Sequence, residues 1–325
     1  MKRSCVFVLG VFALISMASV HGQTSAGYPV RPVRILVAQA AGGQVDLVTR
    51  SIAAQLSARL GQQILVDNRS SASGIVGAQL VAKAAPDGYT LLPVANTFAI
   101  VPSLIANAGY DPLKDFSAIS LFARVPQVLV VNPALPAQSV KELIALAKSR
   151  PNKISYASAG TGGTGHLAAE LFSHSVGIQM LHVPYKGNSQ AIVDVMAGVV
   201  DVMFDQVGTS LSFIRSGKLR GLAMTSRTRS PLLPLLPTID ESGVPGFEDI
   251  TFIGLAAPAG TPREILVKLN AEIGRAVRVP ALREHFLELG VELASSESPE
   301  EFSAQIKAEI EKKGSLIREA GIKVD

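Results

Sequence analysis

Short runs of β-branched residues alternate with amphipathic helical patterns along most of the chain. Residues 33–38 (VRILVA) form an apolar run typical of a buried strand. The glycine pair Gly42-Gly43 follows, and apolar residues then recur at helical spacing from 45 to 60. Further strands are expected at 63–66 and 89–94, with a helix between them at 75–85. This β-α-β-α-β order predicts a parallel, doubly wound sheet.

The same pattern starts again in the second part of the chain. Ser139 followed by Glu142 has the spacing of a capping box and predicts a helix over 139–149. The remaining elements expected here are strands at 154–157, 180–183, 200–204 and 219–224, and helices at 166–176, 189–197 and 209–216. Two or three C-terminal helices are expected, around 262–277, 281–289 and 299–320.

Two long apolar stretches, 119–132 and 250–258, flank the second unit and lack a clean helical period. No Gly/Ser-rich linker separates the two units. We therefore predict that both stretches are strands that cross between two lobes, and that the C-terminal helices return to the first lobe. The alternative is two sequential domains joined by a single linker.

The N-terminus has the layout of a cleavable secretory signal. Lys2 and Arg3 precede an apolar run from Cys5 to Val20, and small residues follow it. The run is shorter than the ~20 apolar residues that span a bilayer, which argues against the alternative of a retained anchor. We expect cleavage near residue 22, with Ala26 as the alternative position. Either removes the only cysteine and leaves no disulfide or thiolate metal ligand.

Composition and motif spacing argue against several classes of function. Without Lys2 and Arg3, 28 basic residues face 26 acidic ones and there is no Trp, so nucleic-acid binding has little support. The histidines at 166, 174, 182 and 285 do not have metal-binding spacing, and no G-x-S-x-G motif is present. We therefore expect no metal, no cofactor and no catalytic activity.

Two glycine loops lie where a strand is followed by a helix. The segment 160–165 (GTGGTG) formally matches the dinucleotide fingerprint, but the acid expected about twenty residues later is replaced by Pro184-Tyr185-Lys186. What remains is a loop whose backbone N–H groups favour an anion at a helix N-terminus. Residues 40–44 (AAGGQ) form a second such loop after the first strand. Because ligands bind at the carboxyl ends of strands, we expect the two loops to face each other across a cleft. The simpler alternative is that both are only tight turns.

Three side chains near these loops have competing interpretations. Asp46 and Arg50 are four residues apart, and a local ion pair on the helix is the simpler reading. Asp205 follows the strand 200–204, where it could either contact a ligand or order the loop, and the sequence does not decide between them. His166 opens a helix, and we favour packing beneath the loop over a role as general base.

The combination of motifs resembles the Bug family, the substrate-binding proteins of tripartite tricarboxylate transporters. The matching segments cover almost the whole mature chain: Tyr28-Pro29, AAGGQVDLVTR (40–50), DNRSSASGIVGA (67–78), PDGYTLL (86–92), YASAGTGGTGHLAAELF (156–172) and VPYKG (183–187). A proline is usual in the family where Ala41 stands here, and the family's R-P-G-A-G-G is replaced by residues 69–74.

The resemblance implies an α/β fold of the two-lobe periplasmic binding protein type (type II-like). Each lobe is expected to be a mostly parallel sheet flanked by helices, with the ligand cleft between the lobes. The expected boundaries are a signal peptide at 1–22, lobe 1 at 27–123 plus 253–325, and lobe 2 at 124–252.

The implied function is capture of a small carboxylate for a membrane uptake system. The protein would be a periplasmic monomer, with a mono- or dicarboxylate, an amino acid or an aromatic acid as ligand and the membrane transporter subunits as partners. A ligand-sensing subunit of a membrane signalling protein is the alternative, and a nucleotide-using enzyme is a weaker one. The ligand-binding residues expected are Ala41, Gly42, Gly43, Gln44, Asp46, Asn96, Thr97, Ser158, Gly160, Thr161, Gly162, Thr164, His166 and Asp205.

Overall fold

The computed structural model describes residues 27–39, 41–69, 74–105 and 107–322. Within these ranges, no helix is both long and apolar enough to cross a membrane. The expected signal peptide at 1–22 and the last three residues assigned to lobe 1 lie outside the described residues.

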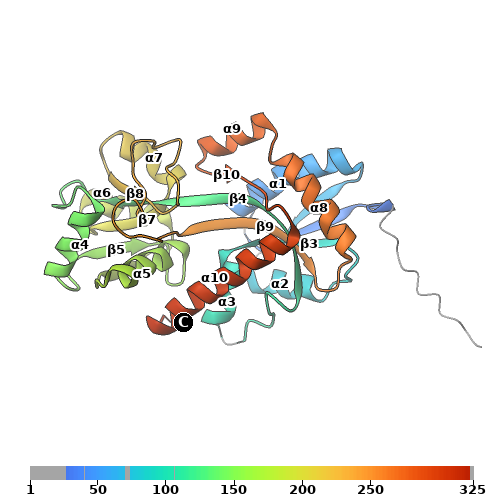
Figure 1. The fold of residues 1–325 in the computed structure, drawn as a ribbon, viewed down its shortest axis with the longest axis horizontal. Helices are drawn as coiled ribbons and strands as arrows, with labels where there is room; N and C mark the ends of the chain where they lie inside the picture. The colour runs from blue at the N-terminus through green and yellow to red at the C-terminus, as the bar shows by residue number, and fades with distance from the viewer. Residues whose placement is uncertain (1–26, 40, 70–73, 106, 323–325) are drawn as a thin grey trace, which may run out of the picture.

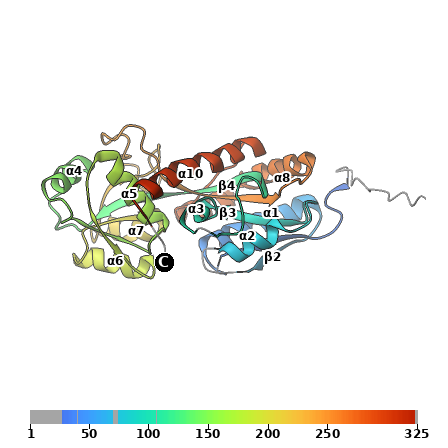
Figure 2. The same cartoon turned by 90° about the horizontal axis from the view of Figure 1, so that it is seen from below.

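The first lobe is built from both ends of the chain (Figures 1 and 2). Strand β1 pairs in parallel with β2 on one side and β3 on the other. Helices α1 and α8 pack together, as do α3 and α10. The elements of this lobe are β1 (Val33–Val37), α1 (Gln44–Leu60), β2 (Ile64–Asn68), α2 (Ile75–Ala82), β3 (Thr90–Ala95), α3 (Asn96–Leu104), α8 (Arg263–Ala276), α9 (Pro280–Glu288), β10 (Glu292–Leu293) and α10 (Pro299–Glu319).

The second lobe contains the middle of the chain, drawn in green and yellow in Figure 1. Strand β5 pairs in parallel with β6 and β7. The elements of this lobe are α4 (Val140–Ser149), β5 (Ser155–Ser158), α5 (Thr164–Val176), β6 (Leu181–Pro184), α6 (Asn188–Ala197), β7 (Val202–Gln206), α7 (Val207–Arg215) and β8 (Arg220–Met224).

Two long strands, β4 (Phe116–Val131) and β9 (Ile250–Pro258), run between the lobes (Figure 1). Strand β4 pairs with β9 as far as Pro126, and from Gln127 onward it pairs with β7 and β8 instead. All the strands thereby join one continuous sheet in the order β2-β1-β3-β9-β4-β7-β5-β6, with β8 and β10 also paired to β4. The exact lobe boundaries at 124 and 253 stay a prediction.

The expectation of a mostly parallel sheet in each lobe needs one correction, because the continuous sheet is mixed in both lobes. Strand β9 runs antiparallel to both β3 and β4, and β4 runs antiparallel to β7 and β8. The reason is the double crossing: β4 carries the chain out of the first lobe and β9 carries it back, so the two strands run in opposite directions. The predicted two-lobe α/β fold class is otherwise confirmed.

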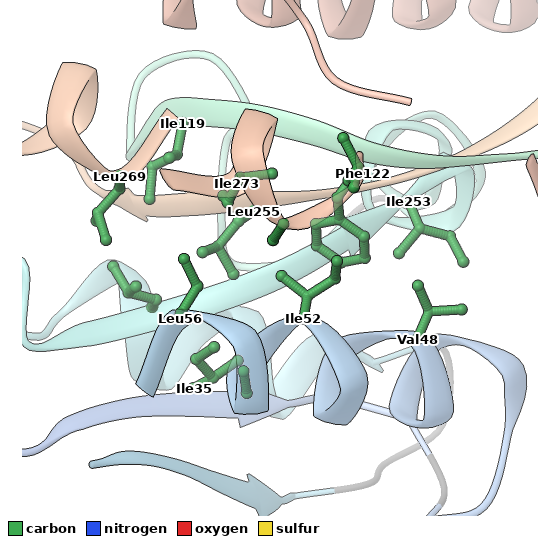
Figure 3. Close-up of a cluster of buried hydrophobic side chains, with 14 of the residues drawn as sticks. Ile35, Val48, Ile52, Leu56, Ile119, Phe122, Ile253, Leu255, Leu269 and Ile273 are labelled. Carbon is green, nitrogen blue, oxygen red and sulfur yellow. The ribbon is translucent and has the colours of Figure 1, made fainter. Parts of the chain in front are cut away.

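Each lobe has its own hydrophobic core. In the first lobe, Val48, Ile52 and Leu56 form one stripe of α1, and the cluster around them includes side chains from β4, β9 and α8 (Figure 3). Full burial of such a side chain contributes about 1.5–3 kcal/mol. Because an isolated helix is only marginally stable in water, this packing supplies most of the stability of α1. The second lobe packs separately around Tyr156, Phe172 and Phe204. Away from the crossing strands, a small apolar cluster of Ile100, Leu167 and Ile317 joins the lobes.

Local sequence signals agree with most of these elements. Ser139 accepts a hydrogen bond from the Glu142 amide at 3.2 Å, as the capping box predicts, and Gly61 ends α1 in the left-handed conformation with φ 66°. The helix expected at 75–85 ends earlier, at Ala82. Helix α3 was not predicted, because it is apolar on all sides and contains Pro102.

Candidate functional site

Strand direction places the predicted loops at the inner ends of the two lobes. Ala95, at the end of β3, lies opposite Ile253 near the start of β9, and Gln206, at the end of β7, lies opposite Gln127. Strand β1 is parallel to β3, and β5 is parallel to β7. The carboxyl ends of all four strands therefore point toward the crossing, which is where open α/β sheets bind ligands.

The carboxylate of Asp46 holds the β1–α1 loop in place. This buried group accepts hydrogen bonds from the Gly42 amide (2.9 Å), Arg50 Nε (3.0 Å) and Asn68 Nδ2 (2.9 Å). Burial by itself would raise the pKa of Asp46, but these hydrogen bonds outweigh it and keep the pKa below its usual value. The expected ion pair between Asp46 and Arg50 is present, and the Asp46 carboxylate also holds the loop through the Gly42 amide. Contact of Asp46 with a ligand stays a prediction.

The β5–α5 loop is held by a hydroxyl and an imidazole. Ser158 Oγ lies 2.7 Å from His182 Nε2 and accepts the Gly160 amide at 3.2 Å. The Gly162 amide donates to His166 Nδ1 at 3.0 Å. Two of the amides expected to cradle a ligand therefore already have acceptors within the protein.

Other backbone N–H groups in these loops are uncommitted. In the part of the chain that the structure describes, the amides of Thr161, Thr164, Gly165 and His166 have no acceptor, because the first intrahelical bond of α5 is the one from Leu167 to Gly163. The hydroxyls of Thr161 and Thr164 likewise have no partner there. In α1, the first-turn amides of Val45 and Asp46 are unpaired among the described residues. Ala41 and Gly43 lie in the turn before α1, and Gln44 is its first residue.

Asp205 lies at the end of β7 and orders the loops around it. Its buried carboxylate accepts hydrogen bonds from Asn188 Nδ2 (2.7 Å), Ser210 Oγ (2.7 Å) and Thr209 Oγ1. Burial raises the pKa of Asp205 above its usual value, although the hydrogen bonds oppose the shift. These partners favour the ordering role that the sequence left open.

Asn96 and Thr97, at the start of α3, are placed differently from each other. The buried carboxamide of Asn96 donates to Ile250 O and Glu309 Oε1 and accepts the Phe252 amide at 2.8 Å. Asn96 therefore fixes the first residues of β9 through hydrogen bonds to their backbone. Thr97 is half-buried and lines a small cavity.

Three polar residues at these loops were not predicted. His182 supports Ser158, and Asn188 supports Asp205. Gln39, at the end of β1, lines the same small cavity as Thr97, and its Oε1 is buried without a hydrogen-bond partner. An acceptor without a partner in such a place is open to a donor from a ligand or water. The signal for Gln39 was its position directly after the first strand.

The loops offer little positive charge. Arg50 is the only described Lys or Arg in the segments 41–50 and 158–166, and it is engaged by Asp46 and Asn68. Among the described residues, no three His, Cys, Asp or Glu side chains are grouped so that they could hold a metal ion. An anion at this site would be met by backbone dipoles and hydroxyls.

Comparison with known proteins shows the family to which the chain belongs. Residues 48–322 match the model of the tripartite tricarboxylate transporter family receptor. A solved structure described as R. palustris Rpa4515 with adipate is 37% identical, with a TM-score of 0.75, and covers 91% of this chain and 99% of its own. The periplasmic binding protein BugD is 37% identical (TM-score 0.72; 91% and 99% covered), and MatC from Rhodopseudomonas palustris, with bound malate, is 32% identical (TM-score 0.71; 89% and 100% covered). The chain belongs to the tripartite tricarboxylate transporter receptor family, the Bug proteins, which are substrate-binding receptors.

Proposed function

We propose that this protein binds a small carboxylate between its two lobes in the periplasm, as a monomer, and delivers it to the membrane subunits of a tripartite transporter. In this role the chain carries out no chemistry on the ligand. The lobes close on the carboxylate, and the crossing strands β4 and β9 serve as the hinge.

The observation that carries the proposal is the set of uncommitted amides at the first turn of α5. The amides of Thr164, Gly165 and His166 lie at the positive end of the helix dipole, beside the hydroxyls of Thr161 and Thr164, which have no partner in the described part of the chain. Each hydrogen bond to a charged acceptor contributes about 1.5–3 kcal/mol. Three or four such bonds are enough for roughly micromolar affinity after the cost of association.

The solved relatives support the ligand class. Two of them hold adipate and malate, which are both dicarboxylates. A dicarboxylate would also use both lobes, with one carboxylate at the first turn of α5 and the other at the first turn of α1. The amides of Val45 and Asp46, which have no acceptor among the described residues, are available for this second group.

A thermal-shift screen tests the proposal directly. The mature protein is unfolded, refolded to remove any carried-over ligand, and screened against dicarboxylates that include adipate and malate, with adipamide as the uncharged control. A ligand at 100 times its Kd stabilises the folded protein by ~2.7 kcal/mol, which is easily detected. The proposal predicts stabilisation by at least one carboxylate and none by adipamide. Equal stabilisation by the diamide, or none by any carboxylate, would contradict it.

A further inference from the structure

Three rings are stacked beneath the β5–α5 loop. His166 and His182 lie with ring centroids 4.0 Å apart and planes 15° from parallel. The Tyr156 ring is nearly parallel to both, with its centroid 4.9 Å from that of His182 and 6.1 Å from that of His166. The rings come from α5, β6 and β5 respectively. His166 is almost completely buried, and His182 is half-buried.

Each imidazole holds one polar group of the loop. His166 Nδ1 accepts the Gly162 amide at 3.0 Å, so this nitrogen carries a lone pair and the ring proton sits on Nε2. His182 Nε2 lies 2.7 Å from Ser158 Oγ, which in turn donates to Gly160 O and accepts from the Gly160 amide. The two histidines thus fix the two glycines of the loop that have positive φ, Gly160 at 132° and Gly162 at 77°.

The hydrogen bond to Gly162 requires His166 to be uncharged. A second proton could bind only to Nδ1, where it would meet the Gly162 N–H head-on and break the bond. The neighbouring imidazole also disfavours a charge at a 4.0 Å separation. Burial, and then the nearby His182, lower the pKa of His166 to about 4, so the acceptor persists at neutral pH.

The described groups around His166 do not offset this preference. Tyr156 faces the stack from β5, but its hydroxyl is bonded to Glu170. Glu170 Oε1 lies 4.0 Å from His166 Nε2, beyond hydrogen-bond distance. Helices α3 and α10 approach the adjacent Leu167 with Ile100 and Ile317, which are apolar. On β7, Asp205 is taken up by Asn188, Thr209 and Ser210.

We propose that His166 and His182 act as an uncharged positioning pair, which turns the Gly162 amide and the Ser158 hydroxyl inward and leaves the first-turn amides of α5 free for the ligand carboxylate. This inference rests on the proposed carboxylate site. It assigns the two imidazole rings to the support of the loop and leaves direct ligand contact to the first-turn amides of α5 and to the hydroxyls of Thr161 and Thr164.

Two matched substitutions separate this role from simple packing. In His166→Asn, Oδ1 takes nearly the position of Nδ1 and can still accept the Gly162 amide, but it cannot titrate. In His166→Gln, the amide group reaches toward the Nε2 position instead. His174→Asn is the control, because His174 lies on the same helix, 60% exposed, and pairs with Glu319.

The readouts are the Gly162 amide resonance in ligand-free protein and calorimetry with adipate at pH 7.5. The Gly162 resonance should shift with a midpoint near pH 4 in the wild type, together with the His166 ring, and should not titrate in His166→Asn. His166→Gln should weaken adipate binding about tenfold, the value of one hydrogen bond, and Asn should recover most of that loss. His182→Phe, which keeps the stack but loses the Ser158 contact, should weaken binding similarly.

The inference and the proposed function fail in different ways. If no carboxylate in the screen binds the wild type, the proposed ligand class is wrong, and the Gly162 titration alone decides the positioning role. If the Gly162 amide is insensitive to protonation of His166, or if Gln supports adipate binding as well as Asn and His do, the positioning role is overturned.

Discussion

The buried ion pair between Lys313 and Asp249 should make the hinge sensitive to loss of either charge. Lys313 Nζ, from α10, lies 2.6 Å from Asp249 Oδ1, and the two side chains are only 2% and 4% exposed. The Asp249 amide donates to Thr225 O in the second lobe, one residue before β9 begins. The pair therefore ties α10 to the point where the chain crosses between lobes.

Lys313→Met leaves the carboxylate of Asp249 buried without its counter-ion. Nearby Glu309 adds a second, half-buried carboxyl group, and burial raises its pKa above the usual value. Removing one partner of a buried pair typically costs about 3–5 kcal/mol, whereas replacing both partners by apolar residues is often nearly neutral. We expect Lys313→Met to lose stability in the 3–5 kcal/mol range and the Lys313→Met/Asp249→Leu double variant to regain at least about half of it.

The assay is urea unfolding at pH 7.5, followed by circular dichroism, for the wild type, both single variants and the double variant. Lys307→Met is the control, because its pair with Glu311 spans 3.9 Å and both side chains are more than 60% exposed. That control should change stability by less than about 0.5 kcal/mol. A loss below about 1 kcal/mol in Lys313→Met, or additive single losses in the double variant, would refute the reasoning.

Three further predictions concern single positions. Gly208→Ala should lower the free energy of unfolding by about 1–3 kcal/mol, because an added Cβ would lie 2.2 Å from Leu289 O of the other lobe. The control is Gly187→Ala, which should cost much less because nothing lies within 4 Å of its added Cβ. Both are measured by urea unfolding. Ser139→Ala should cost about 1 kcal/mol through the lost helix cap, measured the same way. Because the pKa of His166 is lowered to about 4, the wild type should lose stability relative to His166→Asn as pH falls from about 6.5 toward 4; parallel pH profiles would contradict this.

The sequence predicts most of the architecture because the signals for it are local. The helical period from Val45 to Leu60 and the glycine at position 61 define α1, and Ser139 with Glu142 defines the start of α4. The long apolar stretch at 119–132 corresponds to β4, whose residues from Ile119 to Val131 are buried except for Arg124. Helix α3 escaped prediction because it is apolar on all sides, so no periodicity distinguishes it from a strand.

The site could be predicted only down to the level of loops. Strand-to-helix junctions with glycines mark where a ligand binds, but which atoms are free to bind it depends on distant partners. Asp46 is engaged by Asn68, Ser158 by His182 and Asp205 by Asn188, at separations of 17 to 24 positions in the chain. Strand order brings these partners together, and local sequence patterns do not encode strand order. Asn96 is the extreme case, since its partners lie more than 150 positions away.

Calorimetry with adipate on Thr164 variants tests most directly whether the ligand is held by amides and hydroxyls. Thr164→Val removes a free hydroxyl at the first turn of α5 and should weaken binding about tenfold or more, whereas Thr164→Ser should bind nearly as the wild type does. Lys186→Ala and Arg69→Ala should have little effect, and affinity should change little between low and moderate salt, because buried dipoles are weakly screened. Intact binding in Thr164→Val, with binding abolished in Lys186→Ala or Arg69→Ala, would instead show that a cationic side chain holds the ligand.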